Sequence, residues 1–76
     1  MSKLRKLSGN ELIKILSKNF GFVVVRQKGS HAILIKEDDK GKFGCVVPLH
    51  KELKIGTLKG ILKQSCITEE EFKKYQ

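Results

Sequence analysis

The sequence predicts an α+β fold, a three-stranded antiparallel sheet with helices on one face. Two apolar runs, residues 22–25 and 32–35, flank a Gly-Ser pair, and this pattern is typical of a hairpin with a two-residue turn. Segments with helical period precede and follow the strands, so the predicted order is α-β-β-β-α with a short extra C-terminal helix. Because the long helices must bury their apolar faces, we expect a two-layer sandwich whose other sheet face and hairpin tip stay free for a ligand.

The N-terminal part predicts a lead-in and then a helix. Residues 1–7 are basic, and we expect them to be a loose lead-in. Ser8, with Glu11 three residues later, has the capping-box pattern that begins a helix. Over residues 9–19 the apolar side chains share one broad face, and Gly21 supplies a left-handed end.

Three strands follow, over residues 22–28, 31–37 and 43–48. The second is apolar at four consecutive positions, as expected for a central strand covered on part of both faces. A polar loop over residues 38–42 joins it to the third strand. Pro48 lacks an N–H donor and marks a strand end or an edge. Short loops between the strands predict an antiparallel meander.

A connection over residues 49–54 leads to a second long helix that begins near Ile55. Gly56 and Gly60 each weaken this helix by about 1 kcal/mol relative to alanine. One physical use for such glycines is close approach of the helix backbone to the sheet or to a phosphate.

A second capping box predicts the last helix. Thr68 stands three residues before Glu71, and the helix is expected over residues 69–75. Its glutamates suit a helix N-terminus, where the macrodipole favours negative charge. Phe72 and Tyr75 are expected to fold back on the core.

Length and cysteine usage limit the class of protein. The chain has 76 residues, and we expect one domain over residues 1–76. Cys45 and Cys66 stand in apolar surroundings without metal-ligand spacing, which predicts two reduced, buried thiols in a cytoplasmic protein. The apolar runs are too short for a signal peptide or a membrane span.

Charge is distributed unevenly along the chain. The net charge is +8, with sixteen Lys and Arg against eight Asp and Glu. Residues 1–36 hold eight basic residues and one acid, whereas residues 37–76 hold eight basic residues and seven acids. A basic field of this kind attracts polyanions such as nucleic acid through counterion release. The alternative is a lysine-rich surface that serves solubility.

The Gly29-Ser30-His31 stretch falls in this basic half. Glycine supplies the positive φ that a type II′ turn needs, and Ser30 serves the turn and is also a candidate RNA contact. His31 begins the returning strand, and an imidazole with an ordinary pKa of about 6.5 both gives and takes protons near neutral pH. His31 is thus a candidate general acid or base, and the alternative is an exposed turn histidine.

Further residues are candidates for phosphate or proton-transfer roles. Arg26 and Lys28 flank the turn and suit phosphate binding, although solvated strand ends explain them equally well. Lys59 and Lys63 lie on one flank of the second helix as candidate phosphate contacts. For His50 we favour a structural role, hydrogen-bonding the loop before that helix, over a second proton-transfer group or an RNA contact.

Several stretches together resemble the HicA-type (YcfA-like) toxins of bacterial and archaeal toxin–antitoxin pairs. The resemblance covers nearly the whole chain from Ser8 to Phe72. The stretches that carry it are Arg-Gln-Lys-Gly-Ser-His at 26–31, Val-Pro-Leu-His at 47–50, Glu-Leu-Lys-Ile-Gly-Thr-Leu at 52–58 and Ile-Leu-Lys-Gln at 61–64. Two positions depart from the pattern. Ala32 stands where many members have a second histidine or another polar residue, and Ile55 stands where many have proline.

The resemblance implies a fold like that of a double-stranded-RNA-binding domain. It also implies a metal-independent mRNA interferase that uses His31, and a HicB-type antitoxin that neutralises it. RNA is cut without a metal when its 2′-hydroxyl attacks the adjacent phosphate, provided that a base, an acid and cations assist. The sequence itself predicts no metal site, no nucleotide loop and no cofactor.

Two other interpretations remain open. One is a non-catalytic double-stranded-RNA-binding module, held by shape and phosphate contacts. The other is a domain that mainly grips a partner protein. For the antitoxin, we expect an acidic or edge-pairing protein that covers the His31 face.

Overall fold

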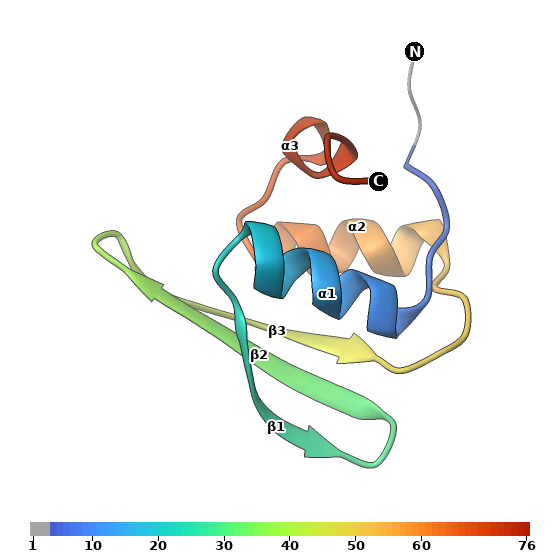
Figure 1. The fold of residues 1–76 in the computed structure, drawn as a ribbon, viewed down its shortest axis with the longest axis horizontal. Helices are drawn as coiled ribbons and strands as arrows, with labels where there is room; N and C mark the ends of the chain where they lie inside the picture. Colours follow the sequence, from blue (N-terminus) through green and yellow to red (C-terminus); the bar gives the residue numbers. More distant parts are fainter. Residues whose placement is uncertain (1–3) are drawn as a thin grey trace.

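The computed structural model describes residues 4–76. Its elements in chain order are α1 (Gly9–Asn19), β1 (Val23–Lys28), β2 (His31–Asp38), β3 (Gly41–Pro48), α2 (Ile55–Gln64) and α3 (Glu69–Lys73). The strands form one antiparallel sheet in the order β1-β2-β3. Helices α1 and α2 lie on the same side of the sheet (Figure 1). The predicted α-β-β-β-α order, the antiparallel meander and the extra C-terminal helix are confirmed.

Alternation along β2 and β3 divides the sheet into a covered face and an open face. Ala32 pairs with Val47 and Leu34 pairs with Cys45, and all four side chains are buried beneath the helices. The intervening Ile33 is only partly buried, because its side chain lies on the other face. The core thus lies between one sheet face and the helices. Its buried hydrophobic residues are Leu4, Leu7, Leu12, Leu16, Phe22, Ala32, Leu34, Cys45, Val47, Leu53, Leu58, Ile61, Leu62, Ile67 and Phe72.

Both predicted capping boxes are present. The Glu11 amide donates to Ser8 Oγ over 3.1 Å, and Glu11 Oε1 accepts from the Ser8 amide over 2.8 Å. Thr68 and Glu71 make the same reciprocal pair at the start of α3. The hydrogen bonds from Ser8 and Thr68 hold the pKa of the Glu11 and Glu71 carboxyls below their usual range. Helix α3 ends at Lys73, two residues before the predicted end, and Phe72 is fully buried.

Both hairpins have two-residue loops. Lys28 pairs with His31, and Gly29 has φ +58° while Ser30 has no positive φ. These are the φ signs of the predicted type II′ turn. The second loop is shorter than predicted, because Asp38 pairs with Gly41 and both strands extend further than the polar sequence suggested.

The prediction of a loose lead-in is wrong for residues 4–7, and residues 1–3 lie outside the described part. Leu4 and Leu7 are buried, and the Leu53 amide donates to the Leu7 carbonyl over 2.8 Å. The Arg5 amide and guanidinium donate to the side-chain and backbone oxygens of Gln76, each over 2.9 Å. The segment is held because its two leucines complete the core.

The glycines of α2 do not approach the sheet. A Cβ built on Gly56 or Gly60 meets no atom of residues 4–76 within 4 Å, so both face away from the described part of the chain. The close approach occurs at Gly9 instead, where a Cβ would collide with the Pro48 carbonyl oxygen. Only glycine lets the start of α1 lie this close to the end of β3.

The cysteines differ in exposure, against the prediction of two buried thiols. Cys45 is buried on β3, and burial raises the pKa of its thiol. Cys66 is exposed and has φ +58°. It occupies the left-handed position of a Schellman motif, since the Ile67 amide donates to the Leu62 carbonyl after α2 ends. This local geometry, which usually selects glycine, turns the Cys66 side chain outward.

Within residues 4–76 no helix is long and apolar enough to cross a bilayer.

Candidate functional site

His31 stands at the first position of β2, in a row that crosses all three strands. It pairs with Lys28 on β1 and with Pro48 on β3. Directly paired residues point to the same face of a sheet. Because the next residue, Ala32, is buried under the helices, His31 belongs to the open face, and its side chain is exposed.

A β-bulge at Val25 determines which β1 residues share the His31 face. The register shifts between Val24 and Arg26, so Arg26 pairs with Ile33 rather than Ala32. Without the extra residue, Arg26 would lie on the covered face. With it, Arg26 and Lys28 both lie on the open face beside His31, because bulges re-aim the side chains that follow them.

The two cations beside His31 are unpaired. Arg26 and Lys28 are exposed, and neither forms an ion pair within residues 4–76. Their positive charge is therefore available to an external anion. A guanidinium two residues from an ammonium on one strand face suits successive phosphate oxygens. We name Arg26, Lys28 and His31 the hairpin cluster.

The end of β3 and the following connection hold the turn in place. The Leu49 amide donates to the Ser30 carbonyl over 2.7 Å. The Gly9 amide donates to the His50 carbonyl over 2.9 Å, which ties α1 to the same end. His50 thus makes a structural contact through its backbone, while its imidazole is exposed. Ser30 is exposed at the turn, as the sequence suggested.

The structure separates the two α2 lysines from the hairpin cluster. Lys59 and Lys63 are exposed on a helix that covers one face of the sheet, whereas His31 belongs to the other face. Lys51 and Lys54 are exposed and precede α2, with Lys54 as its N-cap. The connection from β3 arrives at this end of α2 (Figure 1). At about 1.5 Å per residue, Lys63 lies about 13 Å further along the helix axis than Lys54. The sequence reasoning did not select Lys51 and Lys54, although their position before α2 was visible.

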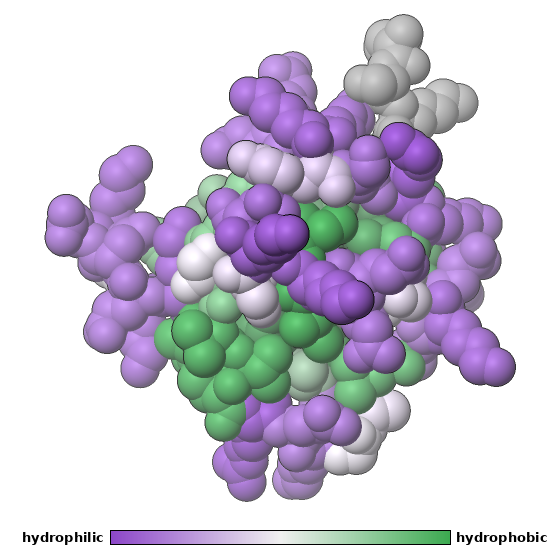
Figure 2. All heavy atoms as spheres, in the orientation of Figure 1, coloured by the Kyte–Doolittle hydropathy of each residue, from purple (hydrophilic) through white to green (hydrophobic). Residues whose placement is uncertain are grey.

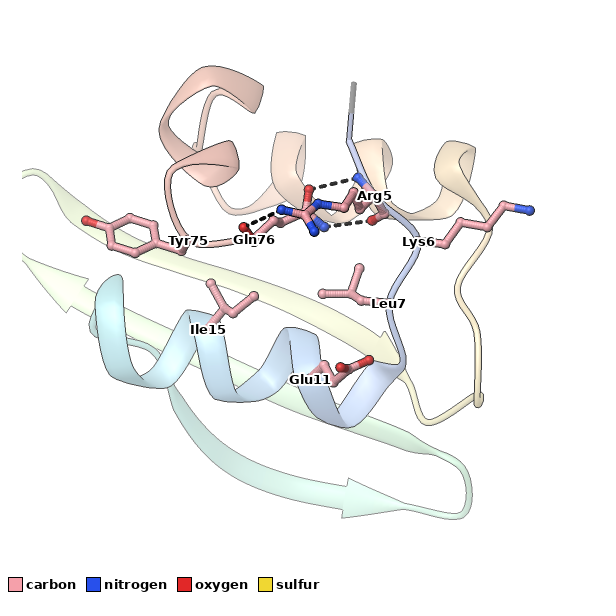
Figure 3. Close-up of a pocket in the computed structure, with 7 residues that line it drawn as sticks. All are labelled: Arg5, Lys6, Leu7, Glu11, Ile15, Tyr75 and Gln76. Carbon is pink, nitrogen blue, oxygen red and sulfur yellow. Dashed lines mark hydrogen bonds between the residues drawn. The ribbon is translucent and has the colours of Figure 1, made fainter. Parts of the chain in front are cut away.

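A pocket elsewhere on the molecule has several of its polar groups engaged in hydrogen bonds within the chain. The residues around it, shown in Figure 3, are Arg5, Lys6, Leu7, Glu11, Ile15, Tyr75 and Gln76. Arg5 is hydrogen-bonded to Gln76, and the Glu11 carboxylate accepts from the Ser8 amide. This pocket therefore joins the chain ends, and the hairpin cluster remains the candidate site. Among residues 4–76, no three or more His, Cys, Asp or Glu side chains are placed to share a metal ion.

The fold and the hairpin cluster define a small α+β domain with the element order of double-stranded-RNA-binding domains and an exposed histidine between cations. Residues 9–67 match the family described as the HicA toxin of bacterial toxin–antitoxin systems, and the chain belongs to this family. Its members are toxins and generally ribonucleases, so the family implies an RNA substrate and a HicB-type antitoxin partner. Searches of curated proteins and of solved structures found no match.

Proposed function

We propose that this chain is a metal-independent endoribonuclease toxin that cuts mRNA with His31 as general acid or base and thereby inhibits translation and growth. The observation that carries the proposal is the pairing of Lys28 with His31 on the open face, with Arg26 on the same side. A proton-transfer group and two unpaired cations are among the groups that assist phosphodiester cleavage.

The reaction uses these groups, the RNA itself and water. The 2′-oxygen forms a bond to phosphorus while the bond from phosphorus to the 5′-oxygen breaks. His31 takes the proton that leaves the 2′-hydroxyl or supplies the proton that the 5′-oxygen gains, and water takes or supplies the other proton. The products are a 2′,3′-cyclic phosphate and a 5′-hydroxyl. Arg26 and Lys28 hold the non-bridging oxygens as charge grows on them. Acid–base help of this kind contributes about 10²–10⁴-fold in rate.

Residues outside the hairpin cluster extend the RNA contact. Ser30 and His50 lie at the same end as His31, joined through the Leu49 to Ser30 hydrogen bond. RNA that leaves the cluster along this end meets Lys51 and Lys54 before it reaches Lys59 and Lys63. We propose these side chains as phosphate contacts of decreasing weight with distance from His31.

The antitoxin is proposed to be a HicB-type protein that covers the open face around His31. On the β1 side this face carries the unpaired cations Arg26 and Lys28, which suit an acidic partner, and the exposed Val23 beside them, which suits an apolar one. Coverage of Arg26 and Lys28 would deny the phosphate its contacts.

The test is RNA cleavage in EDTA by the natural protein and by His31→Ala, after circular dichroism shows equal folding. We expect the natural protein to produce cyclic-phosphate and 5′-hydroxyl ends, and the variant to lose about 10²–10⁴-fold in rate. Cleavage that stops in EDTA, or that the variant retains, would overturn the proposal.

A second candidate function is a non-catalytic module that binds double-stranded RNA. The element order and the exposed lysines of α2 favour it. This function predicts RNA binding with a steep salt dependence and no cleavage by either protein. The same experiment therefore separates the two candidates.

A further inference from the structure

Strand β1 is exposed along its whole length. Val23, Val24 and Val25 expose 61%, 41% and 57% of their surface. Three consecutive hydrophobic residues of this strand are therefore exposed. Figure 2 shows the apolar area over the β1 side of the molecule, bordered by hydrophilic side chains. Exposed apolar patches of this kind mark interaction surfaces.

The exposed valines lie on both faces of the sheet. Val23 pairs with Ile35, which faces the open side, and Val24 pairs with Leu34, which is buried on the covered side. The helices thus do not bury Val24, although it lies on the helix side of the sheet. A ligand that lies flat on the open face reaches Val23 but not Val24.

Among residues 4–76, no strand pairs with the outer edge of β1, since the sheet order is β1-β2-β3. An added strand that pairs with this edge flanks both faces at once and covers both sets of valines. Strand addition of this kind takes its affinity from backbone hydrogen bonds and its specificity from alternate side chains. The distribution of exposed valines therefore favours edge pairing over a flat contact.

Charge selects the occupant of this edge. The chain carries a net charge of +8, and Arg26 and Lys28 follow the valines on the same strand. A second copy of the chain would place the same positive charges opposite these, and like charges repel. A complementary strand has apolar residues opposite residues 23–25 and acidic residues opposite residues 26–28.

We propose that the antitoxin pairs an extended strand of this apolar and acidic composition with the free edge of β1; the assignment to the antitoxin rests on the proposed function. Strands lie about 4.8 Å apart, so the added strand runs about 10 Å from β2 and His31. Its acidic side chains on the open face meet Arg26 and Lys28. Inhibition follows because the phosphate-binding cations beside His31 are occupied.

Two valines of matched exposure test the geometry. Val24 is 41% exposed on the covered side of β1, and Val46 is 43% exposed on the open face, where it pairs with Ile33. Val24→Glu and Val46→Glu are each titrated calorimetrically with the cognate HicB-type antitoxin. We expect Val24→Glu to weaken binding at least about tenfold, because it places a carboxylate against an apolar and acidic strand, and Val46→Glu to change it by less than about twofold.

Hydrogen exchange of the natural chain provides a second readout that needs no variant. The antitoxin should slow exchange of amides over residues 23–28. The proposal would be overturned if Val46→Glu weakened binding and Val24→Glu did not, or if residues 23–28 gained no protection. A dimer of the chain alone that already protects this strand would also overturn it. Binding is the readout, so the result does not depend on whether His31 cleaves RNA.

Discussion

Strands β1 and β3 pair with the same central strand from opposite sides, yet their surroundings differ. On β3, Cys45 and Val47 are buried under the helices, and the strand end contacts Gly9 of α1. On β1, every residue is exposed, and a bulge at Val25 displaces the register. The difference separates two roles of one sheet. Burial on the β3 side supplies stability, whereas the β1 side leaves cations and apolar side chains available to ligands.

The largest effect on stability should come from truncating a buried valine of β3, and an exposed valine of β1 is the matched control. Val47 is fully buried and Val23 is 61% exposed. We expect Val47→Ala to lower the free energy of unfolding by about 2–3 kcal/mol, because two buried methyl groups are lost and a cavity remains. Val23→Ala should lower it by less than about 0.5 kcal/mol. Urea unfolding measures both, and equal effects would show that β1 is as well packed as β3.

A smaller effect should separate two glycines of the helices. Gly9→Ala places a methyl group on the Pro48 carbonyl, and relief of that collision should cost about 1–3 kcal/mol by shifting α1 away from β3. Gly60→Ala meets nothing and should raise stability by about 1 kcal/mol through helix propensity. Thermal unfolding of the two variants gives the comparison. A stable Gly9→Ala protein would mean that α1 does not depend on this contact.

The smallest effect is the acid dependence of the helix layer. The folded-state pKa of Glu11 and Glu71 lies below the usual 4.5 because each carboxylate accepts a capping hydrogen bond. The capping contribution is therefore present above pH 4.5 and is lost as pH falls through the lower, folded-state pKa. Replacing both by glutamine keeps the acceptor and removes the titration, so the double variant should lose less stability than the natural protein between pH 6 and pH 3. Parallel pH profiles for the two proteins would contradict this account.

Local signals in the sequence were sufficient for the element order. Ser8 with Glu11 and Thr68 with Glu71 identify helix starts, since a capping box is a contact between residues three apart. The Gly29 turn was equally visible, because only glycine readily adopts its φ. These features depend on neighbouring residues alone.

Features that depend on distant contacts were not predicted. The docking of Leu7 against Leu53 joins segments far apart in the chain, and no local pattern indicates it. The same holds for Gly9 against Pro48. The bulge at Val25 could have been inferred, because without it Arg26 would lie opposite Ala32 and not on the face of His31. The sequence thus identified the residues of the candidate site, but their arrangement on one face was seen only in the register of the strands.

We propose that the histidine at the β1–β2 turn, and not the one after β3, performs the chemistry. Both His31 and His50 are exposed at the same end of the molecule, so each controls for the other. The most direct measurement is the single-turnover rate of RNA cleavage in EDTA by His31→Ala and by His50→Ala. We predict a loss of about 10²–10⁴-fold for His31→Ala and of less than about tenfold for His50→Ala. A His31→Ala protein that cuts within about tenfold of the natural rate, or a larger loss in His50→Ala, would contradict the account.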